Sequence, residues 1–392
     1  MALDVGNVDA AVTELASAWR AERRERQGRR HLERADFDAL RAAGVLLLPV
    51  PVDAGGLWVD AATSLRPVCE IYRTLAGGDA SVALVSVMHP AVIAYWLRHP
   101  DPSQPAGAEQ RQAVVARAAA GEQWGTITSE PGSGGDITRS RATAVPIEHE
   151  PFMAGRSYAV SGDKHFGSGS GITDRMMTTA VPEGDEEPTI FAFDARDRPW
   201  DGSDGLRLVA EWDGMGMAAT QSHAMRLEEV PAVRLAWDGP LEAVTRAASP
   251  FAASVFTSVV LGVLDEAIGV ARAQLRPRVE ELRAFEQVEW SRAERDHWVA
   301  VQAYEGGLRA AASDDPAVAL HGALRAKEAV ADLAEDVLRR VTRVIGGGTF
   351  SRRSPFAHWF EDVRALGFLR PPWGLAFDNL LATSFLPPDP PA

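Results

Sequence analysis

The sequence predicts an α+β protein in which a central antiparallel β domain lies between an N-terminal and a C-terminal helical domain. Three observations carry this prediction. Apolar residues recur at helical spacing at residues 10–43 and again after residue 250. Between these regions, short runs of β-branched and aromatic residues are separated by clusters of Gly, Pro and Asp. The length of 392 residues suits two or three domains, and we expect domains at residues 1–121, 122–238 and 239–392.

The N-terminal domain is predicted to hold helical stretches at residues 10–43, 61–98 and 109–120. Residues 10–43 carry Val12, Leu15 and Trp19 at roughly helical spacing. The Pro- and Gly-rich sequence PVPVDAGG separates the first two stretches. Residues 20–34 are rich in arginine, but acidic residues are interleaved with the basic ones. We therefore expect a solvated helix face there, in preference to a binding patch for anions.

The central domain is predicted from runs of strand-forming residues between turn signals. Such runs at this spacing favour an antiparallel arrangement. Their sequences are WGTITSE, RSYAVSG, RMMTTAV, TIFAFDA, LRLVAEW and HAMRLEEV.

The C-terminal domain is predicted to be helical from residue 250 onward. The sequence SPFAASVFTSVVLGVLDEAIGVARAQL is largely apolar, so we expect this helix to be buried on most of its faces. Two amphipathic segments follow, and the chain ends in a Pro-rich sequence that cannot extend a helix.

Composition excludes several classes of protein. The formal net charge is −14, which disfavours nucleic acid as a partner. The single cysteine, Cys69, excludes an intrachain disulfide framework, and no metal-ligand spacing such as HExxH occurs among the nine histidines. The N-terminus has no secretory pattern, and the longest apolar runs, such as residues 255–264, are shorter than the ~20 residues of a membrane span. We expect a soluble, cytoplasmic protein with no metal site and no membrane partner.

Three glycine-rich stretches could carry chemistry, at residues 128–136, 162–171 and 345–350. Glycines allow a backbone to approach a flat or phosphorylated ligand closely. Each stretch also has a purely structural interpretation: a hairpin loop, a flexible turn and a helix stop, respectively. The second resembles a dinucleotide-binding loop, but no helical pattern follows it, so a Rossmann motif is rejected.

Four segments match, in chain order, the motifs of one flavoprotein superfamily. They are GEQWGTITSEPGSGGDITRSRATA, YAVSGDKHFGSGSGITDRMMTTA, EWDGMGMAATQSHAMRLEEVPAVRL and IGGGTFSRRSPFAHWFEDVRA. The segments resemble the acyl-CoA dehydrogenase superfamily, including its flavin-dependent monooxygenase relatives. The resemblance implies that fold, with a four-helix bundle as the C-terminal domain.

The resemblance also implies roles for individual residues. Thr128, Ser129, Phe166 and Ser168 fall at positions that contact the flavin ring. Gly346 and Gly347 match backbone that lies along the FAD of a neighbouring subunit, which implies a homodimer or homotetramer. Ser133 and Gly135, in the first glycine-rich loop, are candidate substrate-binding residues. The expected cofactor is FAD, with FMN as an alternative.

The candidate catalytic positions depart from the dehydrogenase pattern. The usual catalytic Glu falls at Arg370, and its alternative position falls at Ala252, so neither is a base. Glu361 and Asp378 are the acids that could replace it. α,β-Dehydrogenation of an acyl thioester, with an electron-transfer partner, nevertheless remains the nominal first hypothesis.

The alternative is a monooxygenase on the same fold, which takes reduced flavin from a separate reductase and uses O2 to hydroxylate a small organic substrate. That chemistry needs a dry pocket in place of an α-proton base, and His89 or His358 could then act as acid or base. A third hypothesis is a flavin-binding scaffold without turnover.

Overall fold

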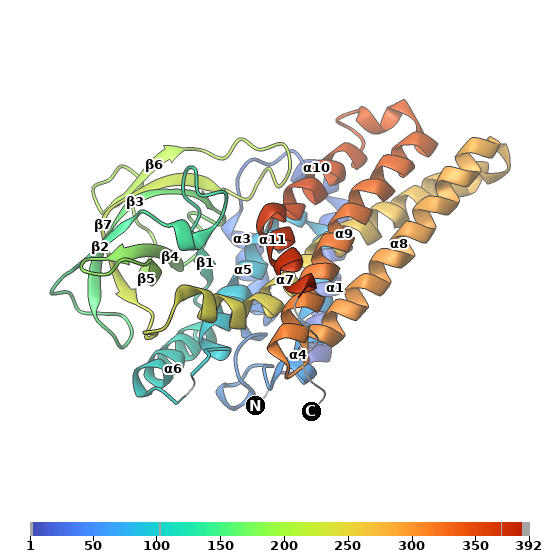
Figure 1. The fold of residues 1–392 in the computed structure, drawn as a ribbon. Helices are drawn as coiled ribbons and strands as arrows, with labels where there is room; N and C mark the ends of the chain where they lie inside the picture. The colour runs from blue at the N-terminus through green and yellow to red at the C-terminus, as the bar shows by residue number, and fades with distance from the viewer. Residues whose placement is uncertain (1–2, 102, 370, 386–392) are drawn as a thin grey trace.

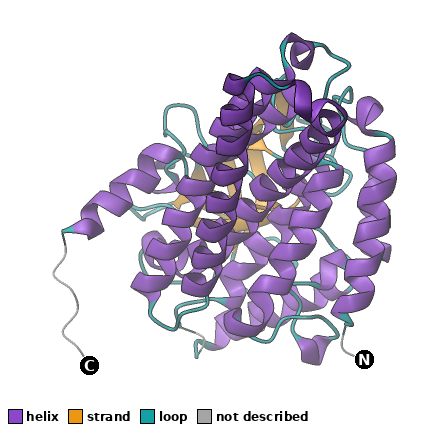
Figure 2. Ribbon diagram, turned by 90° about the vertical axis from the view of Figure 1, so that its right-hand side faces the viewer, coloured by secondary structure: helices purple, strands orange, loops and turns teal. Residues whose placement is uncertain are grey.

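The structure is a computed structural model that describes residues 3–101, 103–369 and 371–385. Seven strands form one sheet at one side of the molecule, and the long C-terminal helices run along the other side (Figure 1). Viewed after a quarter turn, these helices stand in front of the sheet (Figure 2). The protein is therefore a mixed helical and sheet structure, as predicted.

The helices of the N-terminal region pack around a shared apolar core. Asp60 and Asp79 cap the starts of α4 and α5, where their carboxylates accept hydrogen bonds from Thr63 N and Val82 N. Asp79 thereby divides the predicted stretch 61–98 into two helices. The helices are α1 (Val5–Ala21), α2 (Arg23–Arg26), α3 (Arg34–Ala42), α4 (Ala61–Gly78), α5 (Ala80–Leu97) and α6 (Pro105–Ala119).

The sheet follows the predicted runs, with one additional strand. The strands are β1 (Trp124–Thr126), β2 (Thr143–Pro146), β3 (Ser157–Gly167), β4 (Arg175–Pro182), β5 (Thr189–Asp194), β6 (Leu206–Ala210) and β7 (His223–Arg234). Most pairings are antiparallel, but β1 and β2 both pair with β4 in parallel. The expectation of a wholly antiparallel sheet is therefore wrong at these two pairings.

The C-terminal region is built on one long apolar helix. α7 (Leu241–Leu275) is buried along most of its length and packs against α4, α5, α8, α9 and α10. The remaining helices are α8 (Ala284–Ala311), α9 (Pro316–Ile345), α10 (Phe356–Gly367) and α11 (Trp373–Ser384). Gly262 allows α7 to approach α4 closely, since a Cβ there would lie 2.1 Å from the Arg73 carbonyl oxygen.

Two helices are long and apolar enough to cross a membrane by length and composition alone, contrary to the expectation from the apolar runs. Their most apolar windows, in Ala80–Leu97 and Leu241–Glu281, are 89% and 83% buried inside the protein. Both helices therefore serve as core helices of the fold.

The arginine-rich segment at residues 20–34 is in part the solvated helix face that the sequence predicted, since most of its residues are exposed, but several of its arginines bind carboxylates of other elements. Arg20 and Arg23 both bind Glu266 on α7. The buried Arg26 donates from Nε to Asp79 at 2.8 Å and from Nη2 to Asp36 at 2.7 Å. The segment joins the first helices to α5 and α7.

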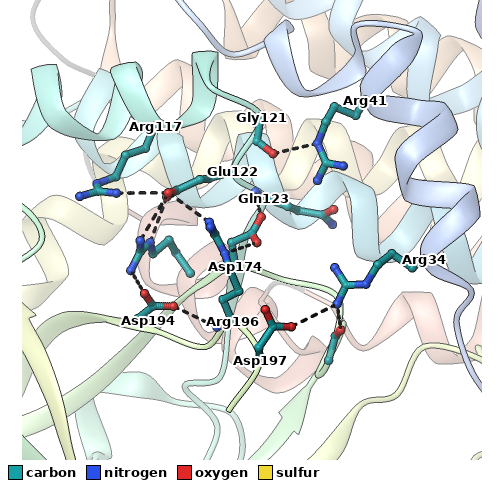
Figure 3. A network of polar contacts seen from close by, with 12 residues as sticks. Arg34, Arg41, Arg117, Gly121, Glu122, Gln123, Asp174, Asp194, Arg196 and Asp197 are labelled. Atoms are coloured by element: carbon teal, nitrogen blue, oxygen red, sulfur yellow. Dashed lines mark hydrogen bonds and ion pairs between the residues drawn. The ribbon is translucent and has the colours of Figure 1, made fainter.

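A second polar network ties the helical region to the sheet (Figure 3). Glu122 follows α6 and binds Arg117, Arg175 and Arg196 at 3.0–3.1 Å. Asp174 accepts a hydrogen bond from the Gln123 backbone N–H at 2.7 Å and from Arg196 at 2.8 Å. These bonds fix the edge of β1 and β4 against α6.

Candidate functional site

An exposed aromatic side chain marks the end of β3. Phe166 is 54% exposed, and its φ of +57° places a bulky residue in the left-handed region. Such a conformation costs a non-glycine residue about 1–2 kcal/mol. Its ring packs edge-to-face against Trp212, with 6.0 Å between the ring centroids. An aromatic ring held out of the core by strained backbone is suited to contact a planar ligand.

The predicted cofactor-binding residues lie on segments adjacent to Phe166. The backbone N–H of His165 donates to the carbonyl oxygen of Ser129 at 2.8 Å, which places Ser129 beside the end of β3. Thr128, which is buried, precedes it. Ser168 follows Phe166 in a tight turn, where its N–H donates to the Phe166 carbonyl oxygen at 2.9 Å. The structure therefore brings Ser129, Phe166 and Ser168 into one region.

A chain of hydroxyl groups continues from Ser168 into the loop before β7. The Ser168 and Ser222 hydroxyl oxygens are 2.8 Å apart, and those of Ser222 and Thr220 are 2.7 Å apart. Thr220 in turn donates to the Met217 carbonyl oxygen at 2.8 Å. All three hydroxyl-bearing residues are buried, so the chain is shielded from water.

The loop at residues 211–222 forms a wall of this region. Its Trp212 indole N–H donates to Met217 O at 3.0 Å, and its Thr220 carbonyl accepts from Gly169 N at 2.8 Å. Met217 and Gln221 are both non-glycine residues with positive φ, at 52° and 46°. The loop is pressed onto α10, since a Cβ on Gly216 would lie 2.2 Å from the Glu361 carbonyl oxygen.

Asp362 on α10 binds the backbone of the loop at residues 211–222. Its Oδ1 accepts a hydrogen bond from the Met217 backbone N–H at 2.7 Å. Burial, with a smaller contribution from Asp79, raises the pKa of Asp362 to about 7. Arg23 and Arg26 line the same cavity as Asp362, but they bind the carboxylates of Glu266 and Asp79.

A small cavity of about 40 Å³ lies between this loop, α10 and the arginine-rich segment, and it includes His358 and Asp362. Burial and the nearby Arg30 and Arg352 lower the pKa of His358, so its imidazole is neutral near pH 7. The candidate His358 is thus partly buried and one helical turn from Asp362.

The candidate His89 has a structural role. It is fully buried in α5, its Nε2 is 2.9 Å from the Leu46 carbonyl oxygen, and its Nδ1 accepts from the Trp124 backbone N–H at 3.1 Å. Burial lowers the pKa of His89 to about 4. Because both ring nitrogens bind backbone groups, His89 has no nitrogen left for proton transfer to a substrate.

The other predicted residues lie in two further places. Ser133 donates to the Glu130 carbonyl oxygen at 3.0 Å and so closes its own turn. Gly135, with φ of +83°, lies against Pro372, which a Cβ would approach to 2.6 Å. Gly346 and Gly347 follow α9, and a Cβ on either would meet nothing within 4 Å in this chain. Arg370 lies outside the described residues.

A buried ion pair that the motifs did not indicate supports the site. Lys164 Nζ lies 2.6 Å from both Glu130 Oε1 and the Thr179 carbonyl oxygen. Burial opposes the ionised carboxylate, but the hydrogen bonds from Lys164 and Ser140 prevail and lower the pKa of Glu130. The pair joins the first glycine-rich loop to β3. Glu130 and Lys164 both lie in the matched motifs, so their opposite charges could have indicated an ion pair between these motifs.

Among the described residues, no group of three or more His, Cys, Asp or Glu side chains is placed to hold a metal ion. The site is instead an exposed aromatic ring, a hydroxyl chain and glycine-rich loops. This combination suits a planar, hydrogen-bonding organic cofactor.

Comparison with solved structures identifies the class of fold. FMN-bound TdsC from Paenibacillus sp. A11-2 aligns with a TM-score of 0.79 at 21% sequence identity, covering 98% of this chain and 99% of that one. No protein-family model matches the chain. The chain has the acyl-CoA dehydrogenase-like fold, and the predicted resemblance to that superfamily is confirmed.

Proteins similar in sequence include bacterial monooxygenases and nitrososynthases. The amino sugar nitrososynthase DnmZ from Streptomyces peucetius is 29% identical over 86% of this chain and 82% of that protein. A dibenzothiophene monooxygenase from Rhodococcus qingshengii is 26% identical over 67% of this chain, and the match spans 62% of that enzyme's length. YdbM from Bacillus subtilis (strain 168), provisionally named an acyl-CoA dehydrogenase, is 27% identical over 91% of this chain and 90% of that protein.

Proposed function

We propose that this protein is a flavin-dependent monooxygenase that uses reduced flavin and O2 to oxygenate a small organic substrate. The monooxygenase and nitrososynthase relatives support this activity over thioester dehydrogenation. The observation that carries this proposal is the site around Phe166 and Ser168. Its described hydrogen bonds run through hydroxyl and backbone groups, and a monooxygenase does not need the carboxylate base that a dehydrogenase requires.

The carboxylates that could serve a dehydrogenase support the same choice. Position 252, within α7, is an alanine. The carboxylate of Glu361 binds Arg364 on its own helix at 3.2 Å. Asp378 is exposed on α11. None of these residues is a buried base beside Phe166.

The residues present fit a flavin. The Phe166 ring would pack against the isoalloxazine, and Ser129 and Ser168 would hydrogen-bond to its polar atoms. Bound reduced flavin would activate O2 for transfer of one oxygen atom. The apolar helices α5 and α7 would exclude water from that region, and the neutral His358 would accept a proton at its imidazole.

Further properties belong to the same proposal. The cofactor is FMN or FAD, supplied in reduced form by a separate reductase. The protein is cytoplasmic and forms a homodimer or homotetramer, in which Gly346 and Gly347 contact the flavin of a neighbouring subunit. Its domains are residues 1–121, 122–238 with the sheet, and 239–392 with a four-helix bundle of α7–α10.

The deciding experiment supplies the purified protein with FMN, a flavin reductase, NADH and ¹⁸O₂. Candidate substrates are dibenzothiophene, indole and an amino sugar nucleotide, after the ligands and activities of the relatives and structural neighbours. We expect one ¹⁸O atom in the product of an accepted substrate. Anaerobic bleaching of bound flavin by an acyl-CoA, with no ¹⁸O incorporation, would instead establish the dehydrogenase. A protein whose flavin responds to no substrate would be the scaffold.

A further inference from the structure

The hydroxyl chain behind Phe166 has a fixed direction that follows from counting its protons. A serine or threonine hydroxyl has one proton to donate and two lone pairs to accept. Thr220 uses its proton on the Met217 carbonyl oxygen, which can only accept. In the bond between Thr220 and Ser222, the donor must then be Ser222. Ser222 has no second proton, so Ser168 must be the donor in the bond that joins them.

This direction decides what Ser168 can offer to a ligand. Its only hydroxyl proton points inward to Ser222, and only lone pairs remain for another partner. A ligand N–H can donate to those lone pairs, whereas a ligand nitrogen that only accepts finds no proton. The backbone bond from Gly169 N to Thr220 O, at 2.8 Å, holds the two loops that carry Ser168 and Thr220 together.

The two redox states of a flavin differ in this respect. The N5 atom of the oxidised ring is an acceptor, and in the reduced ring it carries a proton and donates. We propose that Ser222 and Thr220 are positioning residues that hold Ser168 as a hydrogen-bond acceptor, so that the site selects reduced over oxidised flavin. This inference rests on the proposed function, and it names the chemical form of the cofactor that the site prefers.

The residues that set this selectivity do not themselves touch the ligand. Ser222 and Thr220 are buried, and their hydroxyl groups act through Ser168. Removal of either hydroxyl frees the chain to reverse. In Ser222→Ala, the Ser168 proton loses its inward acceptor and can turn to the ligand. In Thr220→Val, Ser222 can donate to Ser168, which again releases the Ser168 proton.

The test measures the dissociation constants of oxidised FMN and of anaerobically reduced FMN for wild type, Ser222→Ala and Thr220→Val. We expect wild type to bind the reduced form at least tenfold more tightly. Both variants should shrink that ratio about tenfold, mainly by binding oxidised FMN more tightly. By linkage, the midpoint potential of bound FMN should be about 30 mV lower in each of these two variants than in wild type.

The matched control is Ser170→Ala. Ser170 is also buried in this loop, but its hydroxyl donates to the Gly167 carbonyl oxygen at 2.7 Å, outside the chain. In Ser170→Ala, the ratio of the dissociation constants of oxidised and reduced FMN should equal that of wild type. Wild-type ratios in Ser222→Ala and Thr220→Val, in variants with unchanged melting temperature, would overturn the inference and leave the proposed function standing. A wild-type protein that binds neither form of FMN would overturn both.

Discussion

Strain at single residues is concentrated around the candidate site. Of the five described non-glycine residues with positive φ, Phe166, Met217 and Gln221 belong to this region. Strained backbone persists only where its surroundings fix it, and it commonly marks functional sites. The exposure of Phe166 supports this interpretation, because burial of its ring does not offset the cost of its conformation.

Substitutions of Phe166 therefore allow the effect of its backbone strain on stability to be separated from the effect of its ring on flavin binding. Phe166→Gly should raise the free energy of unfolding by about 1 kcal/mol, because glycine adopts positive φ without strain. The same variant should weaken the binding of reduced FMN about tenfold, because the stacking ring is lost. Phe166→Ala keeps the strain and should lose only binding. Denaturant titrations and flavin titrations check these outcomes, and unchanged FMN affinity in both variants would remove Phe166 from the site.

Asp362 gives a pH dependence whose sign follows from its pKa. Burial raises that pKa from 3.8 to about 7, so the folded protein favours the neutral carboxyl. The resulting stabilisation is complete below pH 4 and is lost as the pH rises through 7. Asp362→Asn remains neutral and can still accept the Met217 N–H bond. We expect it to be more stable than wild type at pH 8, by up to about 4 kcal/mol, and to lose this advantage toward pH 4.

Thermal melts of wild type and Asp362→Asn between pH 4 and pH 8 measure this effect. Other charged or titratable groups near Asp362 are unchanged in the variant and cancel in the comparison; they are Arg23, Arg26, Arg29, Asp79, His358 and Glu361. Asp9→Asn is the control, since it replaces an exposed carboxylate on α1. A stability difference that does not vary with pH would contradict the assignment of the raised pKa to Asp362.

At the scale of elements, the arginine-rich segment stabilises the fold through buried ion pairs. Arg26 binds Asp79 at the start of α5 and Asp36 on α3, and its guanidinium lies 4.4 Å from the centre of the Trp19 ring. Removal of one partner from a buried pair leaves uncompensated charge, at a cost of about 3–5 kcal/mol. Arg26→Ala should therefore lower the free energy of unfolding by about 3 kcal/mol or more.

Arg24→Ala is the comparison within the same short helix. Arg24 is exposed, so its replacement should change stability by less than about 0.5 kcal/mol. Urea unfolding of both variants distinguishes the two roles. Equal, small effects would mean that residues 20–34 form the solvated face that the sequence alone suggested.

The elements that the sequence predicted are those whose periodicity reports burial. The apolar α7 and the strands β4 and β5 were identified because apolar side chains dominate them. The short β2 was missed, since its four residues carry little pattern. The parallel pairing of β1 with β4 could not be predicted, because local sequence does not specify which strands become neighbours.

The candidate site was predicted only in part, for a related reason. Motif matches located Ser129, Phe166 and Ser168, which the structure brings together. The same matches could not show that Ser222, Thr220 and Met217 lie behind Ser168, because the contact joins segments about 50 residues apart in the chain. Nor could composition show that both nitrogens of His89 bind backbone groups.

At the scale of the whole molecule, the glycine-rich turn after α9 is a candidate contact between subunits. Gly347 and its neighbours Gly346 and Gly348 follow an amphipathic helix, and a Cβ on any of them would meet nothing within 4 Å in this chain. One glycine ends a helix readily, but three in a row exceed what a helix stop requires. Their small size therefore suits close contact with something outside the chain, as expected for a flavin in a neighbouring subunit.

Gly347→Leu tests that interpretation, because Gly347 does not need positive φ and its side has open space. We expect an unchanged circular dichroism spectrum and melting temperature for the protomer, since no contact within the chain is disturbed. Affinity for reduced FMN should fall at least tenfold, and light scattering should show whether the assembly also dissociates. Gly374→Leu is the control, because Gly374 is exposed on α11 with equally open space. If Gly347→Leu bound FMN like wild type in an intact oligomer, the glycine turn would be a helix stop only, and the cofactor would be held by residues of one chain.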